Sequence, residues 1–200
     1  MPSHGKSSKF SELSLKLYVY ILNTFITSLK YEDVILCGHS LGGAVIQSYY
    51  FTHPSRVRAL ILVGTGGRLT VSPVTLESLT TNYQEFLKAL PSGAFYRKTS
   101  KDIIEAYISE SSTIGPDVTF QDFSICDKFD TLEKTSSINI PCLIIVGAED
   151  KMTPMKYSNY FHENININEY KIIQKAGHMV MLEKSEEFNK VIEDFIQKYF

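Results

Sequence analysis

Four short runs of apolar residues along the chain predict the strands of a buried sheet. They cover residues 34–37, 59–63, 142–146 and 170–173. The first run is continuous, with no alternation of apolar and polar positions, which is typical of a parallel strand covered on both faces. A helical segment separates the first two runs, and such a strand, helix, strand unit requires a right-handed parallel crossover.

Three segments carry apolar residues at helical spacing. Residues 11–29 form the first, with Ser11 as the expected N-cap, and residues 42–53 form the second, which ends before Pro54. The last helix begins near Ser185 and places two acidic residues in its first turn, where they complement the helix dipole. Its apolar side is made by Phe188, Val191, Ile192, Phe195 and Ile196.

The pattern changes between residues 68 and 140, where buried-strand runs disappear and weakly amphipathic helical pieces at 83–90 and 103–108 take over. A strandless stretch of this length is too long for an ordinary loop and favours a helical cap. We therefore expect an α/β protein with a mostly parallel sheet and flanking helices. Residues 1–67 and 141–200 would form its core, and residues 68–140 a cap, or lid, inserted between two strands.

The composition supports a single domain with a sizeable core. Hydrophobic residues make up 44% of the 200 positions, and 12 Tyr and 12 Phe are among them. The 20 Lys and Arg residues nearly balance the 22 Asp and Glu residues, so no strong field of one sign is present to hold nucleic acid or an anionic membrane. A small neutral or apolar molecule is the expected partner.

The cysteines and the N-terminus indicate a soluble, cytoplasmic protein. Cys37 and Cys142 lie within apolar runs, and we expect both to be reduced residues of the core. No short Cys or His spacing typical of a metal site is present, so no metal is expected. The N-terminus has no apolar signal segment, and no run approaches the roughly 20 apolar residues that span a bilayer.

The sequence Gly38-His39-Ser40-Leu41-Gly42-Gly43 follows the first predicted strand directly and opens a helix. It matches Gly-x-Ser-x-Gly, in which a nucleophilic serine projects from a sharp turn, and Gly38 and Gly42 are expected to give the clearance between strand and helix. The N–H of Leu41 would then point at the oxyanion formed when Ser40 attacks a carbonyl. Taken alone, the motif can also be a glycine-rich turn with an incidental serine.

A nucleophilic serine needs a histidine base and a carboxylate that orients the base. Asp150 follows the third predicted strand and His178 follows the fourth. Because loops at the carboxyl ends of parallel strands face one crevice, we expect Ser40, Asp150 and His178 to converge as a catalytic triad. Glu149 is the competing carboxylate. The competing histidines are His4, His39, which we expect only to shape the turn, and His53 and His162, which suit solvated structural roles.

Three motifs together resemble the α/β-hydrolase family: Gly-His-Ser-Leu-Gly-Gly, Gly-Ala-Glu-Asp-Lys-Met-Thr-Pro, and Ala-Gly-His-Met-Val-Met-Leu-Glu-Lys-Ser-Glu-Glu-Phe. They occur in the family's order, and the resemblance covers essentially the whole chain. It implies an acyl-enzyme mechanism on an ester or related carbonyl substrate, with residues 68–140 acting as a lid. The serine argues against members that use an aspartate nucleophile, such as haloalkane dehalogenases and epoxide hydrolases.

The chain departs from the family at its front. Residues 2–7 resemble the loop that follows the fourth strand of the family sheet, so we expect the strands before that loop to be missing. The loop that usually donates the second oxyanion N–H would be missing with them. The strand at residues 34–37 would then lack a neighbour, and such an apolar edge can pair with a second copy of the chain.

The sequence thus predicts a carboxylesterase-like enzyme that cleaves carboxylic esters of small molecules and needs no metal or organic cofactor. Lipase, thioesterase, lactonase and amidase activities stay open. The alternative is an inactive fragment or remnant that keeps the triad by descent and acts as a binding module or as part of a larger complex.

Overall fold

The computed structural model describes all 200 residues and contains a four-stranded sheet in which every strand pair is parallel. The strands lie side by side in chain order, as β1 (Val34–His39), β2 (Val57–Val63), β3 (Cys142–Gly147) and β4 (Asn168–Ile173). Each predicted apolar run falls within one of them. Because all four strands run in one direction, the loops that follow them emerge at the same edge of the sheet.

Nine α-helices complete the fold, and they confirm the predicted α/β class. They are α1 (Leu15–Ser28), α2 (Leu41–Thr52), α3 (Pro73–Thr81), α4 (Tyr83–Ala94), α5 (Lys101–Ser112), α6 (Pro116–Lys128), α7 (Met155–Asn164), α8 (Val180–Glu183) and α9 (Ser185–Tyr199). Two short 3₁₀ helices, η1 (Pro54–Arg56) and η2 (Leu132–Ser137), lie between them.

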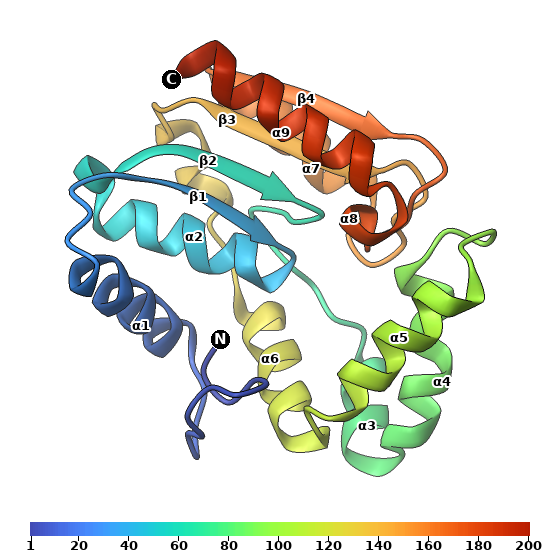
Figure 1. Cartoon of the computed structure of the whole chain (residues 1–200). Helices are drawn as coiled ribbons and strands as arrows, with labels where there is room; N and C mark the ends of the chain where they lie inside the picture. Colours follow the sequence, from blue (N-terminus) through green and yellow to red (C-terminus); the bar gives the residue numbers. More distant parts are fainter.

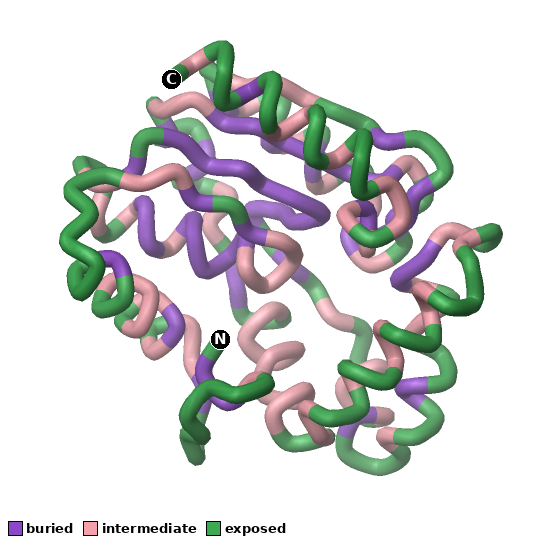
Figure 2. Tube along the Cα trace, viewed as in Figure 1, coloured by how far each residue is buried: buried purple, intermediate pink, exposed green.

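Helices cover both faces of the sheet (Figure 1). On one face, Leu60 and Ile144 of the sheet pack with Tyr49 of α2 and Phe161 of α7. On the other face, neighbouring residues of the same strands pack against Phe195 of α9. Successive strand side chains point to opposite faces, so strands buried on both sides need the nearly unbroken apolar runs seen in the sequence. Figure 2 shows the resulting buried centre in β2, β3 and α2.

The strand β1 lies at an edge of the sheet and pairs only with β2. Its position corrects one expectation, because Cys37 is exposed, whereas Cys142 on the inner strand β3 is buried. Leu36 packs on the face that α2 covers, so the next side chain along, Cys37, points to the opposite face. There α9 packs against β4, at the far side of the sheet from β1.

The start of α1 also differs from the prediction, since the N-cap is Ser14 and not Ser11. The Ser14 hydroxyl accepts a hydrogen bond from the Leu17 N–H at 3.2 Å. One residue earlier, the Leu13 N–H donates to Gln121 Oε1 on α6 at 2.6 Å. This contact ties Leu13 to another helix, and the helical hydrogen bonds begin after it, with the Tyr18 N–H donating to the Ser14 carbonyl at 3.1 Å.

Residues 68–140 contain α3 to α6 and η2, and no strand beyond an isolated bridge between Arg68 and Asp130. We call them the insertion segment. The predicted helical pieces at residues 83–90 and 103–108 fall within α4 and α5. In Figure 1 the helices α3, α4 and α5 lie apart from the sheet, whereas α6 lies near α2 and the N-terminus. The role of the segment as a cap stays a prediction.

Candidate active site

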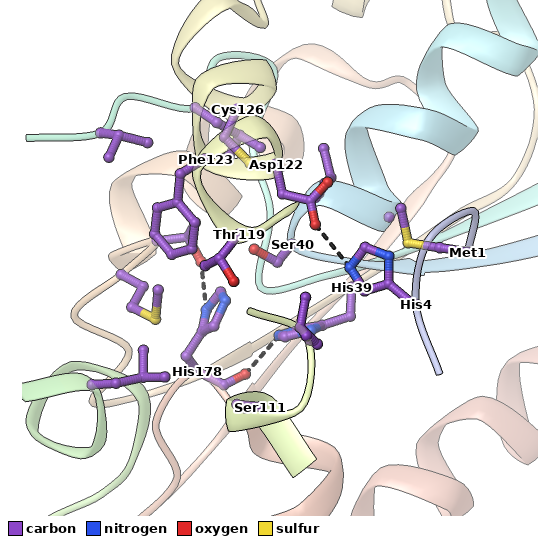
Figure 3. Close-up of a pocket in the computed structure, with 18 of the residues that line it drawn as sticks. Met1, His4, His39, Ser40, Ser111, Thr119, Asp122, Phe123, Cys126 and His178 are labelled. Atoms are coloured by element: carbon purple, nitrogen blue, oxygen red, sulfur yellow. Dashed lines mark hydrogen bonds and ion pairs between the residues drawn. The ribbon is translucent and has the colours of Figure 1, made fainter. Parts of the chain in front are cut away.

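Ser40 lies in the sharp turn between β1 and α2. Its backbone has a φ of 52° and a ψ of −119°, a strained conformation for a residue with a side chain. Two hydrogen bonds hold this turn: the Ser40 N–H donates to the Val63 carbonyl at 3.0 Å, and the Thr65 hydroxyl donates to the Ser40 carbonyl at 2.9 Å. The strain projects the Ser40 side chain into a cavity (Figure 3).

Close approach of strand and helix makes two glycines of this turn necessary. A Cβ atom on Gly38 would lie 2.4 Å from the Gly42 carbonyl oxygen, and one on Gly43 would lie 2.4 Å from Thr65 Oγ1. A Cβ on Gly42 would meet no atom within 4 Å. The expectation that Gly42 gives clearance is therefore wrong, and Gly43 has that role, because it is the residue whose Cα faces Thr65.

Asp150 and His178 form a buried pair in the loops that follow β3 and β4. The distance between His178 Nδ1 and Asp150 Oδ2 is 2.8 Å, and their side chains are 4% and 0% exposed. A carboxylate only accepts, so Nδ1 carries a hydrogen, and in the neutral form of the ring Nε2 is the acceptor. Glu149, the competing carboxylate, donates its backbone N–H to the Ala176 carbonyl at 2.9 Å, and of the two carboxylates Asp150 is the one bonded to the histidine.

The Asp150 carboxylate is fully surrounded by donors. Oδ1 accepts from the N–H groups of Met152 and Thr153 at 2.9 and 2.8 Å, and Oδ2 accepts from the Thr153 hydroxyl at 2.8 Å. Burial acts to raise the pKa of Asp150, but the hydrogen bonds and charge of His178 and the bonds from Thr153 outweigh it, so the net pKa lies below its ordinary value. Asp150 is therefore ionised at neutral pH.

His39 contacts both the backbone and the ring of His178. Its Nε2–H donates to the backbone carbonyl of His178 at 2.9 Å, and the two ring centroids are 4.4 Å apart (Figure 3). Burial, and then the nearby His178, lower the pKa of His39 to about 3, so its ring is neutral near pH 7. Sequence reasoning assigned His39 only to the turn, because its contact with a residue 139 positions away leaves no local signal.

The remaining histidines lie outside this pair. His53 contacts Thr52, and His162 contacts Asn168, both on the surface. His4 lines the cavity, and its Nε2 lies 2.9 Å from Asp122 Oδ2 on α6. No three His, Cys, Asp or Glu side chains are grouped to hold a metal ion.

One cavity of about 1650 Å³ brings Ser40, Leu41 and His178 to a common space. More than half of its 46 lining residues are hydrophobic, and they come from α1 and α2 as well as from the insertion segment. Leu41 is the first residue of α2, so its N–H has no carbonyl partner within the helix and lies at the positive end of the helix dipole. The hydrophobic part of this lining, beside Ser40 and His178, suits a ligand that carries an apolar group next to its reacting centre.

The sequence matches the family described as serine aminopeptidase, S33, over residues 3–185. The chain belongs to this family of α/β hydrolases. This α/β hydrolase is 39% identical to a thermophilic esterase of known structure, with a TM-score of 0.90 over 99% of this chain and 79% of the other. The family resemblance in the three motifs is thereby confirmed.

Two curated relatives are also similar to this α/β hydrolase. The putative esterase/lipase 2 of Mycoplasma genitalium is 29% identical over 197 residues, which cover 88% of this chain and 69% of the relative. The pimeloyl-(acyl-carrier protein) methyl ester esterase of Neisseria meningitidis is 24% identical over 176 residues, which cover 81% of this chain and 56% of the relative.

None of the helices combines the length and apolar character that a membrane crossing requires.

Proposed function

We propose that this α/β hydrolase cleaves carboxylic esters through an acyl-enzyme intermediate, with Ser40, Asp150 and His178 as its catalytic triad. One observation carries the proposal: the strained Ser40 and the Asp150-bound His178 line the same cavity, although they lie 138 positions apart in the chain. The relatives named as esterases support ester substrates.

In the proposed first half-reaction, Ser40 Oγ attacks the ester carbonyl while His178 Nε2 takes the hydroxyl proton. Asp150 holds the ring through Nδ1 and stabilises the imidazolium that forms. The Leu41 N–H stabilises the oxyanion. When the tetrahedral intermediate collapses, the C–O bond to the alcohol breaks, and His178 returns the proton to the leaving oxygen.

In the second half-reaction, His178 takes a proton from water, whose oxygen attacks the acyl carbon of the Ser40 ester. Collapse of this intermediate releases the carboxylic acid and returns the proton to Ser40, so atoms and charge balance over the cycle. The size and apolar lining of the cavity support substrates with an extended apolar acyl or alcohol group. Residues 68–140 would act as the lid over this space.

A hydrolysis screen of p-nitrophenyl esters tests the proposal. Ser40→Ala is expected to lower kcat by roughly 10³-fold or more, because the nucleophile is lost. Ser48→Ala is the matched control, since Ser48 lies on α2 but does not line the cavity, and its kcat should stay at the wild-type value.

A fluorophosphonate probe gives the second readout. We expect the wild-type chain and Ser48→Ala to be labelled, and Ser40→Ala to remain unlabelled. Full esterase activity of Ser40→Ala would contradict the mechanism. A folded wild-type chain that is never labelled would instead favour a non-catalytic binding role.

A further inference from the structure

Glu183, the last residue of α8, connects the histidine loop to the insertion segment. Its Oε2 accepts a hydrogen bond from the Gly177 N–H at 2.6 Å, directly before His178 in the chain. Its Oε1 accepts from the Tyr96 N–H at 2.7 Å and from the Thr99 hydroxyl at 2.5 Å. Tyr96 and Thr99 lie in the loop between α4 and α5. One half-buried carboxylate therefore joins the histidine loop to residues that lie 84 and 87 positions before Glu183 in the chain.

The histidine loop and the α4–α5 loop are also in direct backbone contact. A Cβ atom on Gly177 would lie 2.8 Å from both the Phe95 carbonyl carbon and the Tyr96 nitrogen, so only glycine fits there. On the other side of His178, the Met179 N–H donates to the Ala94 carbonyl at 3.1 Å. The residues before and after His178 are thus both held against the insertion segment, and a shift of either loop would move the imidazole.

Three donors converge on Glu183, and only a carboxylate can accept from all of them with both oxygens. A glutamine would offer one acceptor oxygen, and its amide N–H groups would face either the Gly177 N–H or the Tyr96 N–H and Thr99 hydroxyl. Glu183 does not line the large cavity, so the side chain cannot touch a substrate bound beside Ser40. Its effect on the reaction must pass through the residues that it holds.

We propose that Glu183 is a positioning residue for the reaction, whose carboxylate ties the His178 loop to the α4–α5 loop and so presents the imidazole to Ser40. The inference rests on the proposed function. It also makes the docking of the insertion segment a condition for catalysis, because the same carboxylate serves both loops.

Glu183→Gln tests this inference in the 200-residue chain. We expect kcat for a p-nitrophenyl ester to fall roughly 10-fold to 100-fold, the range associated with a displaced catalytic group, while KM changes little because substrate contacts remain. Glu187→Gln is the matched control, because Glu187 is an exposed carboxylate on the adjoining helix α9, and its kcat should equal that of the wild type.

A double variant separates positioning from a general structural effect. If Glu183 acts through the imidazole, Glu183→Gln should cause no further decrease in the low kcat of His178→Ala. An equal fractional decrease in both backgrounds, or an unchanged kcat of Glu183→Gln alone, would overturn the inference.

Thr99→Val covers the case in which Glu183→Gln does not fold, since it removes only one of the three donors to Glu183. It should lower kcat roughly threefold in the wild type and have no effect in His178→Ala, and any other result would count against the inference.

The outcomes also separate this inference from the proposed function. If Ser40→Ala or His178→Ala keeps full activity, the triad itself is wrong, whatever Glu183→Gln does. If both lose activity and remain folded while Glu183→Gln equals the wild type, the triad stands and only the role of Glu183 is rejected.

Discussion

At the scale of single residues, Thr153 completes the surroundings of the Asp150 carboxylate. Its hydroxyl donates to Oδ2, the same oxygen that contacts His178, and lies 3.2 Å from His178 Nδ1. Its N–H donates to Oδ1. An aspartate followed by a threonine three positions later is a typical turn-forming pattern, so this contact had a weak local signal in the sequence.

Thr153→Val should destabilise the protein in a pH-dependent way. The variant removes one hydrogen bond to a buried carboxylate, and we expect the free energy of unfolding to fall by about 1–3 kcal/mol at neutral pH. Because the folded pKa of Asp150 is depressed, its stabilising contribution is present above the unfolded pKa of about 3.9 and is lost as pH falls through the lower folded value. Urea unfolding of the wild type and the variant should therefore differ most above about pH 4.

Thr153→Ser serves as the control, since it keeps the hydroxyl. Its loss of stability should be smaller and should not follow the titration of Asp150. A stability difference between wild type and Thr153→Val that is constant from acid to neutral pH would contradict this role of the hydroxyl.

At the scale of elements, the contact between β1 and α2 is set by the backbone approach at Gly38. A Cβ there would meet the Gly42 carbonyl carbon and oxygen and the Gly43 nitrogen at 2.4 to 2.7 Å. These are backbone atoms of a helix, which cannot rotate away as a flexible side chain can. The strand and the helix would have to separate, and the turn that holds Ser40 would open with them.

Gly38→Ala and Gly42→Ala form a matched pair four residues apart. We expect Gly38→Ala to lower the free energy of unfolding by about 1–3 kcal/mol or more through overpacking. Gly42→Ala should be neutral or stabilising by up to about 1 kcal/mol, because the methyl group enters open space within a helix. Thermal unfolding measures both, and a Gly42→Ala variant less stable than Gly38→Ala would refute the argument.

At the scale of the whole molecule, Asp122 of α6 joins the insertion segment to the core. It accepts hydrogen bonds from Tyr18 of α1 at 2.5 Å and from His4 of the N-terminal turn at 2.9 Å. His4 Nδ1 lies 2.8 Å from the Pro2 carbonyl oxygen, so both ring nitrogens face acceptors, and the protonated ring can donate to both. The hydrogen bond that His4 donates to Asp122 raises the pKa of His4 against the opposing effect of burial.

Stability gained through His4 should therefore depend on pH. A raised folded pKa means that the contribution is fully present below the unfolded pKa of about 6.5 and is lost as pH rises through the higher folded value. The melting temperatures of wild type and His4→Ala should differ most below about pH 6 and converge at alkaline pH. Asp122 is the main charge facing the ring, and the Met1 amino group has a weaker opposing effect. In a chain that carries Asp122→Asn, the effect of His4→Ala on the melting temperature should therefore no longer depend on pH in this way. A difference that widens with rising pH would contradict the assignment.

The positions of the strands, the turn at Ser40 and the placement of Asp150 and His178 in loops after strands could be predicted because their signals are local. Buried strands need apolar runs, and the residues that follow such strands emerge at one edge of a parallel sheet. Self-association through β1 stays a prediction, although β1 does lie at the sheet edge. Two predictions failed because they depended on contacts between elements. These are the N-cap of α1, placed at Ser11, and the clearance between strand and helix, assigned to Gly42.

The sequence by itself determined which segments become strands and in which order the serine, aspartate and histidine follow them, because periodicity and turn chemistry act over a few residues. Only the tertiary structure decided that Cys37 is exposed, that His39 and Glu183 hold the histidine loop, and that His4 meets Asp122. Those contacts join positions far apart in the chain. Their existence depends on how complete elements pack against one another, and no short stretch of residues carries that information.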